Sequence, residues 1–139
     1  MDKLAAKVNQ RVEEVVAGVT LELFSRVVMR TPVDTGRARA NWVASHGAYA
    51  VREFVFTDSS GSSTLSRIQQ VIEASPRYGT MYLANSLPYA AVLEYGLYPN
   101  PPKVDGGKTV GGYSRQAPNG MVRVSIEEVQ GILRERLAA

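Results

Sequence analysis

The strongest pattern in the chain is a run of apolar residues at three- and four-residue steps over residues 3–30, with Lys, Arg, Glu and Gln between them. This spacing places the apolar side chains on one side of a long amphipathic helix. Valine dominates the run and has modest helix propensity, so packing must supply most of the stability, from the same domain or from a neighbouring subunit. The apolar positions are Leu4, Val8, Val12, Val15, Val16, Val19, Leu23, Val27 and Val28.

After this helix the pattern changes to β-branched and aromatic residues. Residues 37–41 fit either one helical turn or an extended lead-in. Residues 42–46, running into 51–57, predict strand. The connector 58–63 is polar and has no apolar side chain to bury. A first strand is therefore expected between the long helix and this connector.

The connector leads into a helix and a second strand. Residues 64–74 place apolar side chains on one side, which predicts a helix capped by Ser63 or Thr64 and stopped by Pro76. Residues 78–84 alternate as a strand does.

A two-turn helix is expected over residues 87–95, with Pro88 in its first turn and Gly96 at its C-terminal end. Residues 97–120 contain five glycines and four prolines and predict a long, flexible loop, and loops of this length are usually functional or disordered. Residues 121–137 have helical spacing again. The expected fold is a single α+β domain over residues 1–139, with a small antiparallel sheet packed by the long N-terminal helix and the C-terminal helix.

Composition narrows the class of protein. The chain has 139 residues, a net charge of +3 and no cysteine, which excludes disulfides and thiolate chemistry. Charged residues interrupt every apolar run, so no membrane span is predicted, and the N-terminus does not resemble a secretory signal. These features suit a cytosolic site of synthesis.

Catalytic chemistry is poorly supported. His46 is the only histidine and has no acid at a spacing that would orient it, so neither an enzyme site nor a metal site is expected. Gly106-Gly-Lys-Thr109 resembles a phosphate-binding loop, but Pro102 stands where its first glycine belongs. No cofactor is predicted.

The long loop carries a local excess of positive charge together with tyrosines. Lys103, Lys108, Tyr113 and Arg115 are the candidate interface residues. A basic, aromatic loop suits either contact with a neighbouring protein subunit or non-specific contact with a phosphate backbone. Contact with neighbouring subunits is the favoured interpretation.

Two short motifs carry the most specific signal. The first is Arg30-Thr-Pro-Val-Asp-Thr-Gly-Arg37, in which Pro32 ends the long helix and Asp34-Thr35-Gly36 supplies a turn. Thr31 precedes the proline. The second is Pro88-Tyr-Ala-Ala-Val-Leu-Glu-Tyr-Gly96, in which the informative positions are Tyr89, Ala90, Glu94 and Gly96.

Glu94 is the carboxylate of greatest interest in the second motif. Two interpretations stay open for it. It is either an exposed acid at the end of a helix or the partner of an arginine near the first motif, at Arg30, Arg37 or Arg39. The second interpretation would lock the two motifs together.

In this order and spacing, the two motifs resemble those of bacteriophage tail-completion proteins, also called head–tail joining or neck proteins, a class of minor tail component. The resemblance covers roughly residues 5–137, and Ala117-Pro-Asn-Gly-Met121 is similar to the point where the family's loop rejoins its last helix. It implies an α+β subunit of the virion that forms a homo-oligomeric ring, a hexamer or a dodecamer, between head-completion (adaptor) and tail-terminator proteins and lines the DNA channel.

Alternatives stay open beside this interpretation. A tail-terminator or another minor tail subunit has the same kind of fold, and a small nucleic-acid-associated protein would use the basic loop. Under the neck interpretation, deletion of residues 99–116 is expected to leave the fold intact and to block the joining of heads to tails.

Overall fold

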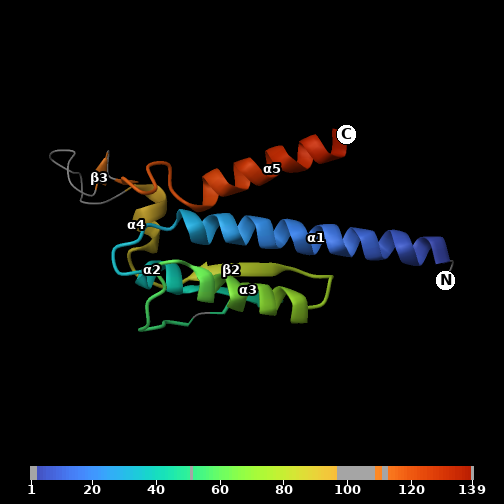
Figure 1. The fold of residues 1–139 in the computed structure, drawn as a ribbon, viewed down its shortest axis with the longest axis horizontal. Coiled ribbons are helices and arrows are strands. Elements are labelled where there is room, and N and C mark those ends of the chain that lie inside the picture. The colour runs from blue at the N-terminus through green and yellow to red at the C-terminus, as the bar shows by residue number, and fades with distance from the viewer. Residues whose placement is uncertain (1–2, 51, 97–108, 111–112, 139) are drawn as a thin grey trace.

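The computed structural model describes residues 3–50, 52–96, 109–110 and 113–138 (Figure 1). Its fold class is α+β, as the sequence predicts. The elements in these ranges follow the order α1 (Lys3–Arg30), α2 (Arg37–Ala40), β1 (Trp42–His46), α3 (Ser62–Ala74), β2 (Met81–Asn85), α4 (Ala90–Tyr95), β3 (Thr109–Val110), β4 (Tyr113–Ser114) and α5 (Val122–Ala138).

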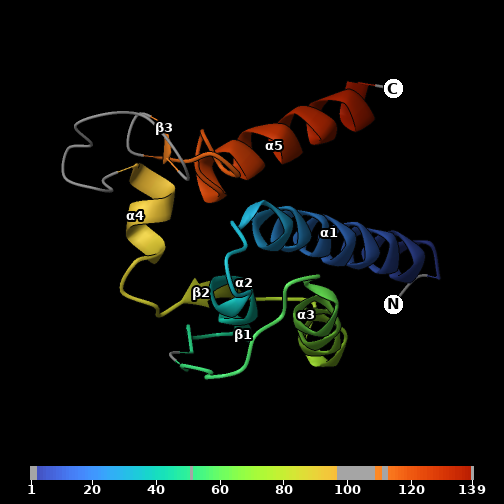
Figure 2. The same ribbon diagram turned by 60° about the vertical axis from the view of Figure 1, so that its left-hand side comes forward.

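A two-stranded antiparallel sheet and three longer helices form the body. Strands β1 and β2 pair with Trp42 opposite Asn85 and His46 opposite Met81. Helix α3 lies against both β1 and α1, and α5 lies against α1. Figures 1 and 2 agree that α1 runs between α5 on one side and α3 with the sheet on the other. A second antiparallel pairing joins the short strands β3 and β4.

The core lies where the C-terminal half of α1 meets the sheet and α3. Trp42 is a core residue, and Leu93 packs against the core from outside. Tyr82 is half-buried beside Tyr49, with ring centroids 6.4 Å apart. The buried cluster consists of Phe24, Val27, Val28, Trp42, Ala44, Ile68, Ile72, Ala117 and Met121.

Helix α5 is fixed to α1 by charge as well as by packing. Glu128 of α5 accepts hydrogen bonds from Arg26, at 2.5 Å, and from Arg30. Arg26 also pairs with Glu22 on its own helix at 2.8 Å. These side chains are only partly buried, so the pairs orient α5 more than they stabilise it.

The predicted strand over residues 51–57 is wrong for the described residues 52–57, which are irregular. The backbone of Phe54 pairs with a side chain instead of a strand: its N–H donates to Asn41 Oδ1 at 2.6 Å, and its carbonyl accepts from Asn41 Nδ2 at 3.0 Å. Asn41 is fully buried. The side chain of Asn41 thus pairs with the backbone N–H and carbonyl of Phe54, which a neighbouring strand would pair in a sheet.

Candidate functional site

The first motif connects the end of α1 to the sheet through buried hydrogen bonds. Thr31 is buried; its hydroxyl donates to the carbonyl of Val27 at 2.8 Å and accepts the indole N–H of Trp42 at 2.7 Å. Pro32 follows Thr31 directly in the chain. Helix α1 ends at Arg30, as Pro32 predicts. The threonine therefore gives a buried tryptophan its hydrogen-bond acceptor.

The turn at Asp34-Thr35-Gly36 packs tightly on the connector that precedes α3. Gly36 has a φ of +91°, and a Cβ placed there would lie 2.6 Å from the backbone nitrogen of Ser59. The carbonyl of Gly36 accepts the N–H of Asp58 at 3.0 Å, and that of Thr35 accepts the Ser59 hydroxyl at 3.3 Å. Asp34 is exposed in the same turn. Glycine is thus required both for its conformation and for its lack of a side chain.

The start of α3 is capped by Asp58, and the predicted cap at Ser63 or Thr64 is wrong. Gly61 precedes the helix in a left-handed conformation and provides no side chain. One oxygen of Asp58 accepts the N–H of Gly61 at 3.1 Å, and the other accepts the N–H and the hydroxyl of Thr64 at 2.8 and 2.7 Å. Asp58 thus joins the Gly36 turn to α3.

These contacts make α3 sensitive to acid. Burial acts to raise the pKa of Asp58, but the hydrogen bonds from Thr64 and Gly61 outweigh it, so the pKa lies below its ordinary value. A depressed carboxyl pKa stabilises the fold above the unfolded pKa of about 3.9, and this contribution is lost as the pH falls through the folded pKa. We expect Asp58→Asn to be less stable than the native chain at about pH 6, with the gap narrowing below about pH 3. Urea unfolding at both pH values measures this, and a constant gap would contradict it.

The second motif ends in a tight contact. Helix α4 begins at Ala90, so Pro88 lies before the helix and not in its first turn as predicted; Tyr89 occupies the cap position and is exposed. Gly96 ends the helix with a φ of +69°, as expected. A Cβ at Gly96 would collide with the ring of Tyr113. The glycine thus lets Tyr113 lie against the end of α4.

Glu94 caps the N-terminus of α5. Its side chain is buried, and its oxygens accept the N–H groups of Met121 at 3.1 Å and of Val122 at 2.8 Å. The N–H of Arg123 lies 3.4 Å from the same carboxylate. Unpaired N–H groups and the positive end of the helix dipole favour a carboxylate at this position. Gly120 leaves room for it, because a Cβ there would collide with Glu94 Oε1.

Both sequence-based interpretations of Glu94 are therefore wrong. The side chain is not exposed, and it does not pair with Arg30, Arg37 or Arg39. Those arginines donate hydrogen bonds to other acceptors, although the Nε atoms of Arg37 and Arg39 are buried without a partner. Their acceptors are Glu128 for Arg30, Glu53 for Arg37, and the carbonyls of Met29, Thr31 and Ser59 for Arg39.

Arg123 binds Glu94 and two neighbouring tyrosines at the start of α5. Its guanidinium donates to the carbonyl of Glu94 at 2.7 Å and lies over the ring of Tyr95 at 4.7 Å. Hydrogen bonding to Tyr113 is the largest of the effects that raise the pKa of Arg123 above its ordinary value. The guanidinium of Arg123 thus links Tyr95, Tyr113 and the buried carboxylate of Glu94 to the start of α5.

The two motifs meet through the segment between β4 and α5. The side-chain amide of Gln116 pairs with the backbone of Val33 in both directions, with its Oε1 accepting and its Nε2 donating at 2.8 Å. Ala117 next to it is buried in the core. We call this assembly the joint: Val33 from the first motif, Glu94 and Gly96 from the second, and residues 113–123. Sequence reasoning missed Gln116, Arg123 and Asp58, because nothing local marks their distant partners.

The joint includes only the C-terminal part of the predicted loop over residues 97–120. The candidate interface residues on that loop therefore have to be considered separately. Lys103 and Lys108 lie outside the described residues. Tyr113 is half-buried within the joint, so it supports the fold, whereas Arg115 is exposed. The expectation that deletion of residues 99–116 would spare the fold therefore needs correction, because Tyr113 and Gln116 contact the body.

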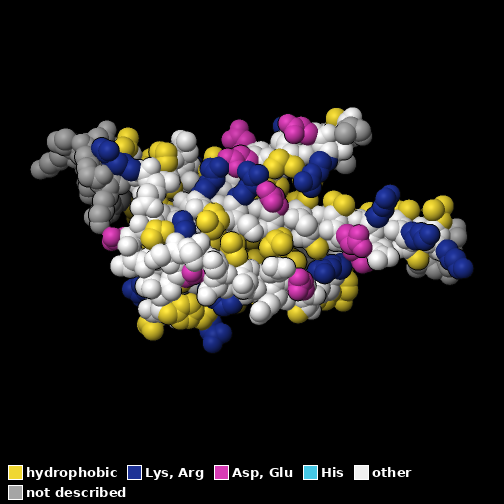
Figure 3. Space-filling model, in the orientation of Figure 1, with side chains coloured by type: hydrophobic (Ala, Val, Ile, Leu, Met, Phe, Trp, Pro, Cys, Tyr) yellow, Lys and Arg dark blue, Asp and Glu magenta, His cyan; other side chains and the backbone are white. Residues whose placement is uncertain are grey.

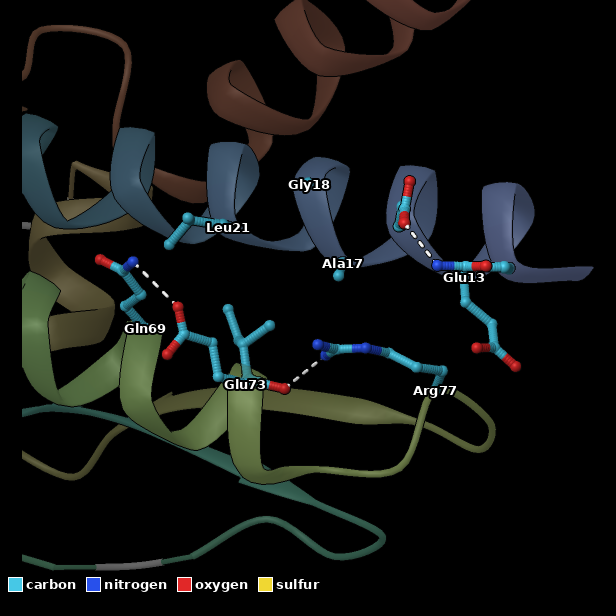
Figure 4. A pocket seen from close by; sticks show the side chains of 10 residues that line it. Glu13, Ala17, Gly18, Leu21, Gln69, Glu73 and Arg77 are labelled. Carbon is cyan, nitrogen blue, oxygen red and sulfur yellow. Dashed lines mark hydrogen bonds between the residues drawn. The ribbon is translucent and has the colours of Figure 1, made fainter. Parts of the chain in front are cut away.

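An open hollow lies between α1 and α3 on the far side of the joint (Figure 4). It has a cavity volume of about 420 Å³ and carries the acids Glu13, Glu14 and Glu73. Gln69 donates to Glu73 at 3.1 Å, and Arg77 donates to a helix-end carbonyl at 2.6 Å. Gln10 donates to Glu14 at 3.3 Å, so two of the three acids, Glu14 and Glu73, are paired with neighbouring amides.

Other features of a chemical site are missing from the part of the chain that the structure describes. No group of three or more His, Cys, Asp or Glu side chains there is arranged to hold a metal ion. His46 lies half-buried with its Nε2 2.5 Å from the carbonyl of Tyr78. Among the described helices none is long and apolar enough to cross a membrane. Searches for a matching protein family, curated protein or solved structure found none.

Proposed function

We propose that this chain is a structural virion protein of a tailed bacteriophage, which forms a ring at the head–tail junction, completes the tail and joins it to the head. Its ring lines the channel through which DNA passes. Copies of the chain and the adjoining head-completion and tail-terminator proteins are its partners. The chain works by binding, with no catalytic step.

The joint is the observation that carries this proposal. Both sequence motifs that resemble the tail-completion family make structural contacts: Gly36 seats the turn on the connector, and Glu94 with Gly96 fixes the ends of the predicted loop. A subunit of this kind needs a rigid base from which a segment reaches a neighbour. The base holds the chain at Gly96 and again at Tyr113, on either side of the predicted interface residues Lys103 and Lys108.

The decisive experiment mixes the purified chain with purified heads and tails of the virus that encodes it. Negative-stain microscopy then locates the chain, and light scattering gives its mass. Rings, or chain bound only at the junction end of heads or tails, are the expected result. Chain that ignores both particles and binds duplex DNA with strong salt dependence would instead support the nucleic-acid alternative, which exposed Arg115 favours.

Replacing residues 99–108 by a Gly/Ser segment of equal length is expected to block joining of heads to tails without changing stability. The replacement removes Lys103 and Lys108 but leaves Tyr113, Gln116 and the rest of the joint in place. Complementation of a virus lacking the native chain measures joining, and urea unfolding measures stability. Infectious particles at native yield would contradict this role for the segment, and a matched Gly/Ser replacement of the exposed residues 48–50 provides the control.

A further inference from the structure

The segment between β1 and α3 carries apolar and basic side chains that protrude from the surface. Val55 is 88% exposed and Phe56 45% exposed, and the ring centroids of Phe56 and Phe54 lie 4.6 Å apart. The guanidinium of Arg52 lies 5.2 Å from the centroid of the Phe54 ring and has no hydrogen-bond acceptor among the described residues. Figure 3 shows hydrophobic and basic side chains together at the lower left, where this segment runs in Figure 1. We call Arg52, Val55 and Phe56 the ridge.

The fold holds the ridge in place although the segment is irregular. The backbone of Phe54 pairs in both directions with the buried side chain of Asn41. The carbonyl of Arg52 accepts the hydroxyl of Ser86 at 3.2 Å, and Arg67 of α3 lies 4.6 Å from the centroid of the Phe54 ring. Neighbouring apolar side chains that a fixed backbone keeps in water are typical of a contact surface.

The hollow between α1 and α3 has an apolar floor that can receive protruding side chains. Ala17 and Leu21 of α1 and Ile72 of α3 line it. Gly18 of α1 adds no side chain, and a Cβ there would meet nothing within 4 Å. The cavity volume of about 420 Å³ lies within the range of roughly 300–1,000 Å³ of pockets that receive ligands. The hollow therefore has room for the apolar side chains of the ridge.

The rim of the hollow is acidic. Glu13 and Glu14 come from α1 and Glu73 from α3, so three carboxylates face one cation, Arg77, among the lining residues. The glutamines that donate to Glu14 and Glu73 are neutral and leave the negative charge in place. Glu13 is exposed and accepts no hydrogen bond from a described residue. The rim therefore attracts a guanidinium such as that of Arg52.

The ridge and the hollow lie on opposite sides of α3. Arg67, which contacts the ridge segment, is two positions from Gln69 and six from Glu73, and these two residues line the hollow. At 3.6 residues per turn, both lie more than about 100° around the helix from Arg67. One copy can therefore use its ridge on one neighbour and its hollow on another. A contact of this kind is heterologous, and its repetition closes a ring or extends a filament.

We infer that the ridge of one copy docks in the hollow of the next copy, with Val55 and Phe56 against the apolar floor and Arg52 beside Glu13. A second copy is the favoured occupant, because the chain itself carries both an apolar, basic protrusion and an apolar depression with an acidic rim. Duplex DNA would suit Arg52 but would gain nothing from the two exposed apolar side chains. The inference rests on the proposed function only for its setting, in which this contact joins neighbouring subunits of the ring.

Sedimentation of the full chain over a range of concentrations tests the charges of the contact. The native chain is expected to associate as its concentration rises, and Arg52→Glu and Glu13→Arg are each expected to weaken association at least tenfold, because each removes the attraction between ridge and rim. An equimolar mixture of the two variants should associate more strongly than either alone, since the intact ridge of one meets the intact hollow of the other. Arg136→Glu and Glu135→Arg, both exposed on α5, change the net charge equally and provide the controls.

Gly18→Leu tests the hollow without changing any charge. Its side chain would fill open space, and leucine has a higher helix propensity than glycine, so the variant should be at least as stable as the native chain in urea unfolding. Its self-association is nevertheless expected to fall at least tenfold. Gly131→Leu on α5 is the matched control, because a Cβ there also meets nothing within 4 Å and the position lies outside the hollow.

The outcomes separate this contact from the proposed function. A native chain that stays monomeric, or an Arg52→Glu or Gly18→Leu chain that associates as the native chain does, would overturn the inference. A monomeric chain whose DNA binding is lost in Arg52→Glu would assign the ridge to a phosphate backbone instead. Association that the variants abolish, in a chain that attaches to neither heads nor tails, would keep the contact and reject only the proposed function.

Discussion

A Gly36→Ala variant is expected to be among the least stable single substitutions in this chain. Alanine has to adopt a φ of +91°, and its Cβ would lie 2.6 Å from the backbone nitrogen of Ser59. The positive φ alone costs about 1 kcal/mol. The collision with backbone cannot be relieved by rotating a side chain, so the turn must move away from the connector. We expect a total loss of about 3 kcal/mol in the free energy of unfolding.

Gly47→Ala is the matched control for this effect. Gly47 has a similar φ of +83°, but a Cβ there meets no atom within 4 Å. Its substitution should cost only the conformational part, about 1 kcal/mol. Urea unfolding of both variants separates backbone strain from the close approach. Equal losses in the two would show that Gly36 is needed for conformation alone and that its contact with the connector is unimportant.

The second large effect is expected at Glu94. Glu94→Ala removes a buried carboxylate that accepts the N–H groups of Met121 and Val122, and it leaves these donors unpaired at the start of α5. Loss of a helix cap and of charge-assisted hydrogen bonds together should cost about 2–4 kcal/mol. Glu94→Gln keeps one acceptor oxygen and should lie between the two.

Glu127→Ala on the same helix provides the comparison, because Glu127 is exposed and caps nothing. Urea unfolding gives the stabilities, and the near-ultraviolet signal of Trp42, which packs in one cluster with Met121, reports on the core. If Glu94→Ala were no less stable than Glu127→Ala, the carboxylate would not hold the joint together.

The helices were largely predictable from the sequence, because local chemistry sets them. Pro32 ends α1 at Arg30, Gly96 ends α4 in a left-handed conformation, and the spacing of apolar residues locates α5 to within one residue at each end. Each signal acts within a few residues of the feature that it controls. The fold class followed from these elements.

The contacts of the joint were not predictable, because they depend on residues far apart in the chain. Glu94 and Val122 are separated by 28 residues, and Gln116 and Val33 by 83. An acid at the end of a helix gives no sign of which N–H groups it will face. The segment 52–57 has the composition of a strand, yet the Asn41 side chain pairs with its backbone. Tertiary contact decided these cases over local propensity.

Because of the joint, lengthening the segment between Gly96 and Tyr113 should reduce the free energy of unfolding only slightly. Its two ends are held by contacts of their own, at the end of α4 and around Arg123. The entropy of closing a loop grows only with the logarithm of its length, so doubling the length costs about 0.6 kcal/mol. Insertions there would leave the folded body nearly unchanged. The segment can therefore diverge quickly in evolution, and it is the natural position for an epitope tag or a fused reporter.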